Sequence, residues 1–166
     1  MRILLAGVGN VLRGDDGFGV AVAQALTRAR FVADRVEIFE AGIAGISLVQ
    51  ELMDGYDALI IVDAIDRGGA PGTIYVIEPE ILDPTLIDPA KLHASLADAH
   101  YTDPSKVLVL AKALGVLPPK VFVVGCQPAG YDELGADLSA AVKGAVQVAV
   151  SRIESLIESL RAEAEA

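Results

Sequence analysis

The chain has 166 residues, of which 53% are hydrophobic and only 5% aromatic, and its formal net charge is −10. This length suits a single domain over residues 1–166, with one core built mainly from aliphatic side chains. The negative charge argues against nucleic-acid binding, because phosphate groups would be repelled. No apolar run reaches the roughly 18 residues of a membrane span, and the first apolar run is too short for a signal peptide. The single cysteine, Cys126, excludes an internal disulfide, so we expect a cytoplasmic protein.

The first half of the chain alternates between strand and helix patterns. Residues 2–8 form a short apolar run that ends in a glycine-rich turn, which predicts a buried strand. Helical spacing follows over 19–30, and the alternating residues 36–40 predict a second strand. A glycine turn and a short helix are predicted over 42–56. Residues 57–65 form the most apolar run, so we expect this strand at the centre of the sheet.

The second half continues the alternation after one irregular segment. A short glycine-rich loop precedes a strand over 72–78, which predicts an antiparallel hairpin with the strand before it. Residues 79–103 show little periodicity. A helix over 102–115, a strand over 120–128 and a long helix over 138–166, capped by Ser139, complete the chain. We therefore predict an α/β three-layer sandwich, in which helices cover both faces of a twisted, mostly parallel sheet of about five strands.

The carboxyl ends of parallel strands form the edge at which such sheets bind ligands. Four polar stretches follow predicted strands and should meet at that edge: 10–16, 40–43, 63–66 and Gln127. The first of them contains two adjacent acids in the stretch GVGNVLRGDDGFGV.

A dinucleotide site explains this stretch poorly. Gly7 and Gly9 could begin the G-x-G-x-x-G fingerprint, but its third position is Leu12. Asp15 and Asp16 would also lie near the helix start that receives a pyrophosphate, where negative charge opposes binding. Helix capping is the simplest role for such acids. One acid would suffice for a cap, so the second needs another explanation.

A divalent-metal site is a more specific possibility. Asp63 ends the most apolar strand, and the two histidines, His93 and His100, both precede a predicted helix. Taken singly, Asp63 could be a turn residue and either histidine a surface residue. Together, two carboxylates and one imidazole would form a site with mixed oxygen and nitrogen ligands and open positions for substrate. No G-x-S-x-G elbow is present, and Cys126, at the end of a buried strand, fits a packed and unreactive thiol better than a nucleophile.

Several stretches, taken in order, resemble the hydrogenase maturation proteases. These are ILLAGVGNVLRGDDGFGV, LIIVDAID, PGTIYVIE, HYTDPSKVLVLAKALG and PPKVFVVGCQP, and the similarity runs from residue 2 to about residue 155. Members of this family are nickel-dependent endopeptidases. They remove a C-terminal extension from the large-subunit precursor of [NiFe] hydrogenases after nickel insertion. The resemblance therefore implies a metal-dependent endopeptidase on a mostly parallel sheet.

The resemblance also implies a set of site residues. Carried over by position, Asp16, Asp63 and His100 would be both catalytic residues and metal ligands, with His100 favoured over His93. Asp15 would then serve the start of the helix. The nickel ion would be contributed by the precursor, which is the expected partner, and a monomer is expected. Where the family often has Gly-Gly-Thr, this chain has Ala41-Gly42-Ile43.

Two other functions stay open on the sequence alone. The first is a non-catalytic, Rossmann-like module that binds a nucleotide or metabolite and uses its acids only as helix caps. The second is a hydrolase on a related fold that processes another precursor.

Overall fold

The computed structural model describes residues 1–29, 34–43, 45–86, 104–130, 134–135 and 137–166. Its centre is a sheet of five strands in the order β2-β1-β3-β5-β4. β1, β2, β3 and β5 run parallel, and β4 is antiparallel to β5. The strands are β1 (Ile3–Val8), β2 (Val36–Gly42), β3 (Ala58–Ala64), β4 (Ile74–Ile77) and β5 (Lys120–Cys126). The predicted three-layer α/β fold is therefore confirmed, with the most apolar strand, β3, in the middle.

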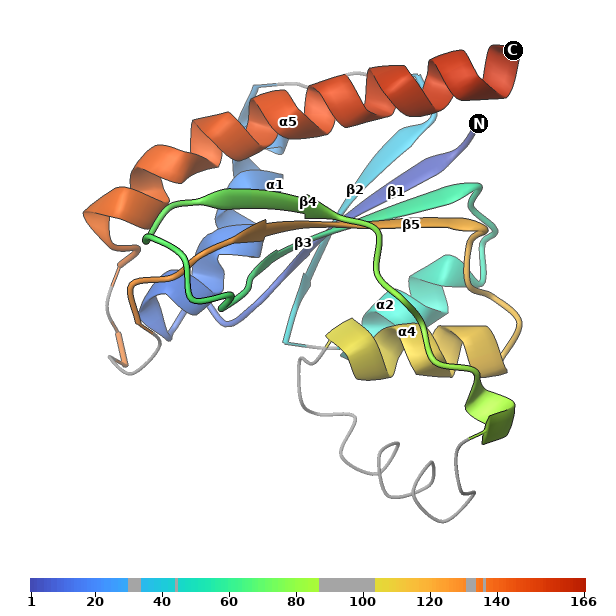
Figure 1. The fold of residues 1–166 in the computed structure, drawn as a ribbon, viewed down its shortest axis with the longest axis horizontal. Helices are drawn as coiled ribbons and strands as arrows, with labels where there is room; N and C mark the ends of the chain where they lie inside the picture. The colour runs from blue at the N-terminus through green and yellow to red at the C-terminus, as the bar shows by residue number, and fades with distance from the viewer. Residues whose placement is uncertain (30–33, 44, 87–103, 131–133, 136) are drawn as a thin grey trace.

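Helices cover both faces of this sheet (Figure 1). Those on one face are α1 (Phe18–Arg28) and α5 (Ala140–Glu165), and those on the other are α2 (Gly45–Leu52) and α4 (Pro104–Ala113). Two short 3-10 helices, η1 (Gly14–Gly17) and η2 (Pro84–Leu86), lie in connections. Pro104 is the first residue of α4, where its missing N–H costs no hydrogen bond.

The core has two layers because successive side chains of a strand point to opposite faces. In β3, Ile60 and Val62 pack with α1 and α5, whereas Leu59 and Ile61 pack with α2 and α4. All seven residues of β3 are buried. A nearly continuous apolar sequence, here interrupted only by Asp63, is typical of a strand covered on both faces.

The predicted hairpin between residues 57–65 and 72–78 is wrong in its pairing. β4 is antiparallel, as predicted, but its partner is β5 and it lies at the edge of the sheet. β5 takes the place beside β3 instead. The connecting loop is tied to the end of β5 by two backbone hydrogen bonds: the Gln127 carbonyl oxygen accepts from the Gly72 N–H, and the Gln127 N–H donates to the Thr73 carbonyl oxygen.

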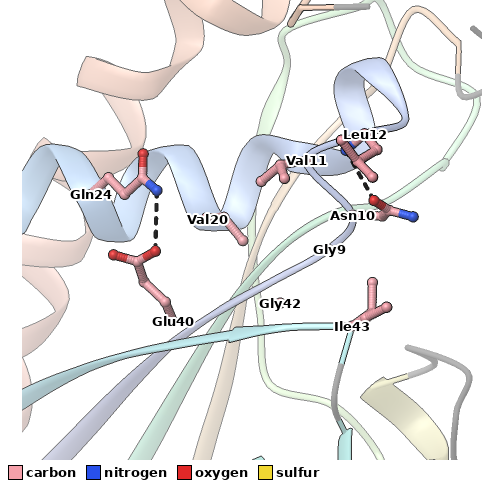
Figure 2. Close-up of a pocket in the computed structure, with 9 residues that line it drawn as sticks. All are labelled: Gly9, Asn10, Val11, Leu12, Val20, Gln24, Glu40, Gly42 and Ile43. Carbon is pink, nitrogen blue, oxygen red and sulfur yellow. Dashed lines mark hydrogen bonds between the residues drawn. The ribbon is translucent and has the colours of Figure 1, made fainter. Parts of the chain in front are cut away.

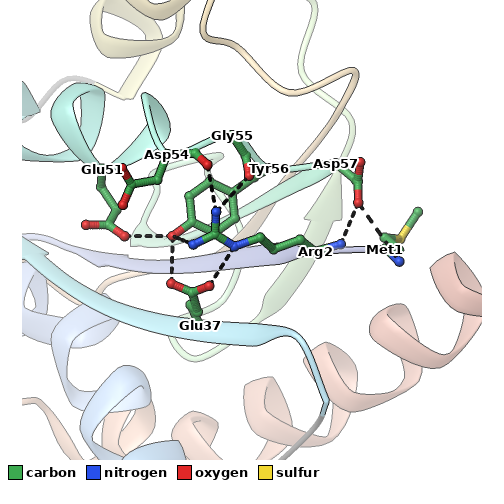
Figure 3. A network of polar contacts seen from close by, with 8 residues as sticks. All are labelled: Met1, Arg2, Glu37, Glu51, Asp54, Gly55, Tyr56 and Asp57. Atoms are coloured by element: carbon green, nitrogen blue, oxygen red, sulfur yellow. Dashed lines mark hydrogen bonds and ion pairs between the residues drawn. The ribbon is translucent and has the colours of Figure 1, made fainter.

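A polar network closes the sheet at the amino ends of the parallel strands (Figure 3). The Arg2 guanidinium lies 4.2 Å from the centre of the Tyr56 ring and pairs with Glu37 at 2.7 Å. It also donates to the carbonyl oxygens of Asp54 and Gly55. The Tyr56 hydroxyl lies 2.9 Å from a Glu37 oxygen and 2.6 Å from a Glu51 oxygen, although its single proton serves one of them at a time.

Both ends of the chain lie at this same side of the molecule (Figure 1). Met1 and Glu165 line one surface hollow together with Arg161, whose guanidinium contacts the carbonyl oxygen of Asp34. Within the described ranges, no helix combines the length and the apolar character needed to cross a bilayer.

Candidate active site

The candidate site lies at the opposite edge, where the parallel strands end. The chain leaves β1 through a turn over residues 9–13, forms η1 and enters α1 at Phe18. Asp16 belongs to η1, and Asp63 is the last residue but one of β3. Because β1 and β3 are hydrogen-bonded neighbours, the two predicted ligands lie at adjacent strand ends, Asp16 after β1 and Asp63 within the last two residues of β3.

Two glycines allow η1 and α1 to lie directly on the sheet. A Cβ atom on Gly19 would lie 2.0 Å from the carbonyl oxygen of Val62 and 2.3 Å from that of Val8. Gly9 has a φ of +124°, and a Cβ there would lie 1.8 Å from the Asp16 carbonyl oxygen and 3.7 Å from Asp63 Oδ1. A side chain at Gly9 would therefore collide with the Asp16 backbone and approach the Asp63 carboxylate, so both groups lie beside this turn.

The two carboxylates differ in their surroundings. Asp16 is half-buried, and its Oδ2 accepts a hydrogen bond of 2.9 Å from the Asn10 N–H. Asp63 is only 5% exposed, and its Oδ1 accepts one of 2.8 Å from the Ala64 N–H. Each acid is thus held by a backbone donor. Among the ion pairs in the described part of the chain, none involves Asp16.

Asp15 has a different role from the predicted one. The start of α1 has no side-chain cap. Asp15 is instead 2% exposed and accepts hydrogen bonds from the Ala129 N–H at 2.8 Å and from the N–H and hydroxyl of Ser139 at 2.7 and 3.0 Å. It joins the first loop to the segment before α5, and Ser139 caps that helix through the Val142 N–H, as predicted.

Gln127 organises the loop that follows β3. Its side chain is 4% exposed, and its Oε1 accepts from the N–H groups of Arg67 and Gly69 at 2.8 and 3.1 Å. Its Nε2 donates to Asp66 at 2.8 Å, and this bond holds the pKa of the Asp66 carboxyl below its usual value, helped by the Gly68 N–H. Asp15 and Gln127 therefore link the loops after β1, β3 and β5 through buried hydrogen bonds.

Cys126 is a poor nucleophile in this setting. Its thiol is buried in the core layer that contains α1 and α5. Burial and the nearby Asp15 charge raise its pKa to about 11. The prediction of a packed, unreactive thiol agrees with this environment.

The third predicted ligand, His100, and its alternative, His93, both lie outside the described residues. Within residues that the structure describes, no group of three His, Cys, Asp or Glu side chains is placed to hold a metal ion. Asp16 and Asp63 supply two oxygen donors suited to a divalent ion, and a third ligand would have to come from elsewhere.

A groove opens at the turn that carries Asn10, lined largely by residues of the stretches 10–16 and 40–43 (Figure 2). It encloses about 370 Å³ between the first turn, α1 and the end of β2. Its walls are mainly aliphatic, and the Gln24 amide donates to Glu40 at 3.1 Å at one end. The residues that line it are Gly9, Asn10, Val11, Leu12, Val20, Gln24, Glu40, Gly42 and Ile43.

Comparisons with known proteins agree with this fold. The family model described as hydrogenase maturation protease matches residues 20–156. The chain is 36% identical over 160 residues to the hydrogenase expression/formation protein HupD of Rhizobium leguminosarum, which covers 96% of this chain and 74% of that protein. It is 33% identical over 171 residues to the hydrogenase 2 maturation protease of Escherichia coli, covering 99% and 98% of the two chains.

Solved structures of hydrogenase maturation proteases have the same fold as this chain. The hydrogenase maturating endopeptidase HybD of E. coli superposes with a TM-score of 0.71 at 32% identity, over 96% of this chain and 94% of that one. The [NiFe] hydrogenase maturation protease HycI of Thermococcus kodakarensis also has a TM-score of 0.71, at 26% identity, over 95% and 92% of the chains. The resemblance seen in the sequence is therefore confirmed, and the chain belongs to the hydrogenase maturation protease family.

Proposed function

We propose that the protein is a nickel-dependent endopeptidase that removes the C-terminal extension of a [NiFe] hydrogenase large-subunit precursor after nickel insertion. The observation that carries this proposal is the placement of both acids around the Gly9–Asn10 turn at the carboxyl edge of the sheet, where Asp63 Oδ1 approaches Gly9 and Asp16 Oδ2 accepts from the Asn10 N–H. Membership of the protease family supports peptide hydrolysis as the chemistry.

In this proposal the nickel ion arrives with the precursor, held by cysteine thiolates of that protein. Asp16, Asp63 and His100 complete its surroundings and orient the precursor at the site. Carboxylate and imidazole donors without a thiolate hold Ni²⁺ weakly, which leaves the metal with the precursor. A bound divalent ion can polarise a carbonyl group or lower the pKa of a water molecule. The residues of this chain bind and position the precursor's metal-bearing segment.

The alternative of a nucleotide-binding module loses its main premise. That reading required both acids to act as helix caps. Neither Asp15 nor Asp16 caps α1, and the Asp15 carboxylate is fully engaged with Ala129 and Ser139. The Asp16 carboxylate lies close to the start of α1 without capping it. Its negative charge would repel a phosphate group bound there.

The test is trimming of a purified precursor, loaded or not loaded with nickel, followed by mass spectrometry. We expect the wild-type protein to shorten only the loaded precursor. Asp16→Asn, Asp63→Asn and His100→Ala should each lose at least about 100-fold in rate, as the loss of a group acting directly at the reacting centre does. His93→Ala should retain the rate.

Asp54→Asn is a matched control, because Asp54 is an exposed acid at the other end of the sheet. Cleavage of the nickel-free precursor at the same rate would contradict nickel dependence. Trimming of a different precursor alone would favour another substrate. Full activity of Asp16→Asn and Asp63→Asn would overturn the proposed site.

A further inference from the structure

The groove beside Asp16 combines apolar walls with one charged side chain. Val11, Leu12 and Ile43 line it with exposed fractions of 57%, 63% and 52%, which are high for large aliphatic residues. Glu40 is the charged residue among those described in the lining, and no lysine or arginine is among them. Its Oε2 accepts from the Gln24 amide, which is neutral.

The position of the groove connects it to the candidate site. Asn10 lines the groove, and its N–H holds the Asp16 carboxylate. Asn10 Oδ1 also accepts from the Leu12 N–H at 2.9 Å, which fixes the turn that carries Val11 and Leu12. Figure 2 shows Asn10, Leu12 and Ile43 at one end of the groove and the Gln24–Glu40 pair at the other. A polypeptide segment bound next to Asp16 would therefore be within reach of this surface through Asn10.

The chemistry of the lining selects the occupant. An uncharged side chain would cover the aliphatic walls but would also remove water from the Glu40 carboxylate without replacing it, which is unfavourable. A lysine or arginine side chain suits both the aliphatic walls and the Glu40 carboxylate. Its methylene stem packs on apolar surface while its charged end pairs with a carboxylate. A net charge of −10 on the whole chain also favours a basic segment over an acidic one.

We propose that this groove binds a lysine or arginine side chain of the protein substrate, with the stem between Val11, Leu12 and Ile43 and the charged end at Glu40. This inference rests on the proposed function, since it assigns a specificity-determining contact for the same protein substrate. Glu40 is a substrate-binding residue here and takes no part in the bond-breaking step.

The first test measures kcat and KM for precursor trimming by wild-type protein, Glu40→Gln and Ile43→Ser. Loss of a hydrogen-bonded charge should raise KM about tenfold for Glu40→Gln, with kcat within about twofold. Ile43→Ser should raise KM about fivefold through lost apolar contact. Increasing salt should raise the wild-type KM and affect that of Glu40→Gln less, because screening acts on the ion pair.

The matched controls lie away from the groove. Glu78→Gln removes an exposed acid that follows β4, and Val148→Ser shortens an exposed aliphatic residue of α5, so both should keep the wild-type KM. No cleavage by the wild-type protein would refute the proposed function itself. Wild-type cleavage with an unchanged KM for Glu40→Gln, or a loss confined to kcat, would overturn the groove assignment alone.

A charge exchange identifies the contact directly. Each lysine or arginine near the cleaved end of the precursor is replaced singly by glutamate, and each product is given to the wild-type protein and to Glu40→Lys. We expect one replaced precursor to be cleaved at least about fivefold faster by Glu40→Lys than by wild type. If Glu40→Lys restores none of them, the proposed ion pair does not exist.

Discussion

The Asp15 carboxylate accepts hydrogen bonds from both the backbone N–H and the hydroxyl of Ser139, which lies 124 residues further along the chain. The neighbouring Asp16 instead accepts a hydrogen bond from the N–H of Asn10, a residue that lines the groove. The two adjacent acids thus differ in role: Asp15 joins two loops, and Asp16 lies at the candidate site.

This separation predicts opposite phenotypes for two adjacent substitutions. Asp15→Asn should lower the free energy of unfolding by about 2–4 kcal/mol, because an amide NH₂ replaces an acceptor facing buried N–H donors. Asp16→Asn should change it by less than about 1 kcal/mol, since Asp16 is half-buried. Urea denaturation of both variants measures the difference. Equal losses for both would show that Asp16 is also a structural residue.

Two glycines predict opposite effects of an added methyl group. Gly19→Ala should destabilise the protein by about 3 kcal/mol or more, because the Cβ atom would overlap two backbone carbonyl oxygens that cannot move separately from the sheet. Gly144→Ala should stabilise it by up to about 1 kcal/mol, since alanine is the better residue inside a helix. A Cβ on Gly144, within α5, has no atom within 4 Å. The check is the thermal unfolding temperature of both variants. An unchanged unfolding temperature for Gly19→Ala would contradict the predicted overlap.

Gln127 predicts a pH-dependent defect. Gln127→Glu keeps acceptors for the Arg67 and Gly69 N–H groups but places a second carboxylate against Asp66. We expect a loss of about 2–4 kcal/mol at pH 7. In the wild-type protein the hydrogen bond from Gln127 lowers the pKa of Asp66. The stability that this bond contributes is therefore fully present above pH 3.8, the ordinary pKa of an aspartate, and is lost only as the pH falls through the lower folded-state pKa.

The two carboxylates of the variant can share protons at acidic pH, so its deficit should shrink between pH 7 and about pH 4.5. Gln127→Met, which removes the hydrogen bonds without adding charge, should show a similar deficit at both pH values. Urea denaturation at the two pH values distinguishes them. A deficit for Gln127→Glu that grows on acidification would exclude repulsion as its cause.

Tyr56 predicts a loss of stability at alkaline pH. Burial and the hydrogen bonds to Glu51 and Glu37 raise the pKa of its hydroxyl above the ordinary 10.0. A raised pKa contributes stability that is complete below pH 10 and is lost as the pH rises toward the folded-state pKa. The pKa of Cys126 is also raised, so its contribution to stability is lost as the pH rises from 9.0 to about 11. The free energy of unfolding should therefore fall above pH 9, less steeply in Tyr56→Phe and in Cys126→Ala.

The measurement is urea denaturation from pH 8 to pH 11.5, followed by fluorescence or circular dichroism. Tyr56→Phe isolates the hydroxyl because it keeps the ring beneath the Arg2 guanidinium. An alkaline decline of unchanged slope in Tyr56→Phe would show that the hydroxyl ionises equally in the folded and unfolded chains.

Local patterns were sufficient to predict the parts of the fold that depend on neighbouring residues. The apolar run of β3, the Ser139 cap and the burial of Cys126 are properties of short stretches, and each is found in the structure. The collection of polar residues at the carboxyl edge followed from the parallel arrangement of the strands.

Contacts between distant segments could not be predicted in the same way. The β4 strand has the expected direction, but only the place of β5 beside β3 decides its partner. The acceptor role of Asp15 depends on where a segment more than 110 residues away arrives. The groove depends on the register of β1 and β2, which shifts between Gly7 and Val8. Hydrophobic periodicity describes single segments and does not predict such contacts between distant ones. The assignment of His100 as a ligand stays a prediction.

The meeting of Met1 and Glu165 at the side away from Asp16 makes the molecule suitable for tethering. A surface anchor or fluorophore attached at either extremity would leave the carboxyl edge facing solution, accessible to a large folded protein. The same proximity suits a circular permutant, in which a short bridge joins the two extremities and a new opening is made at an exposed turn such as Gly115. Trimming by such a permutant would show that the edge needs the packed sheet but not the original order of its segments.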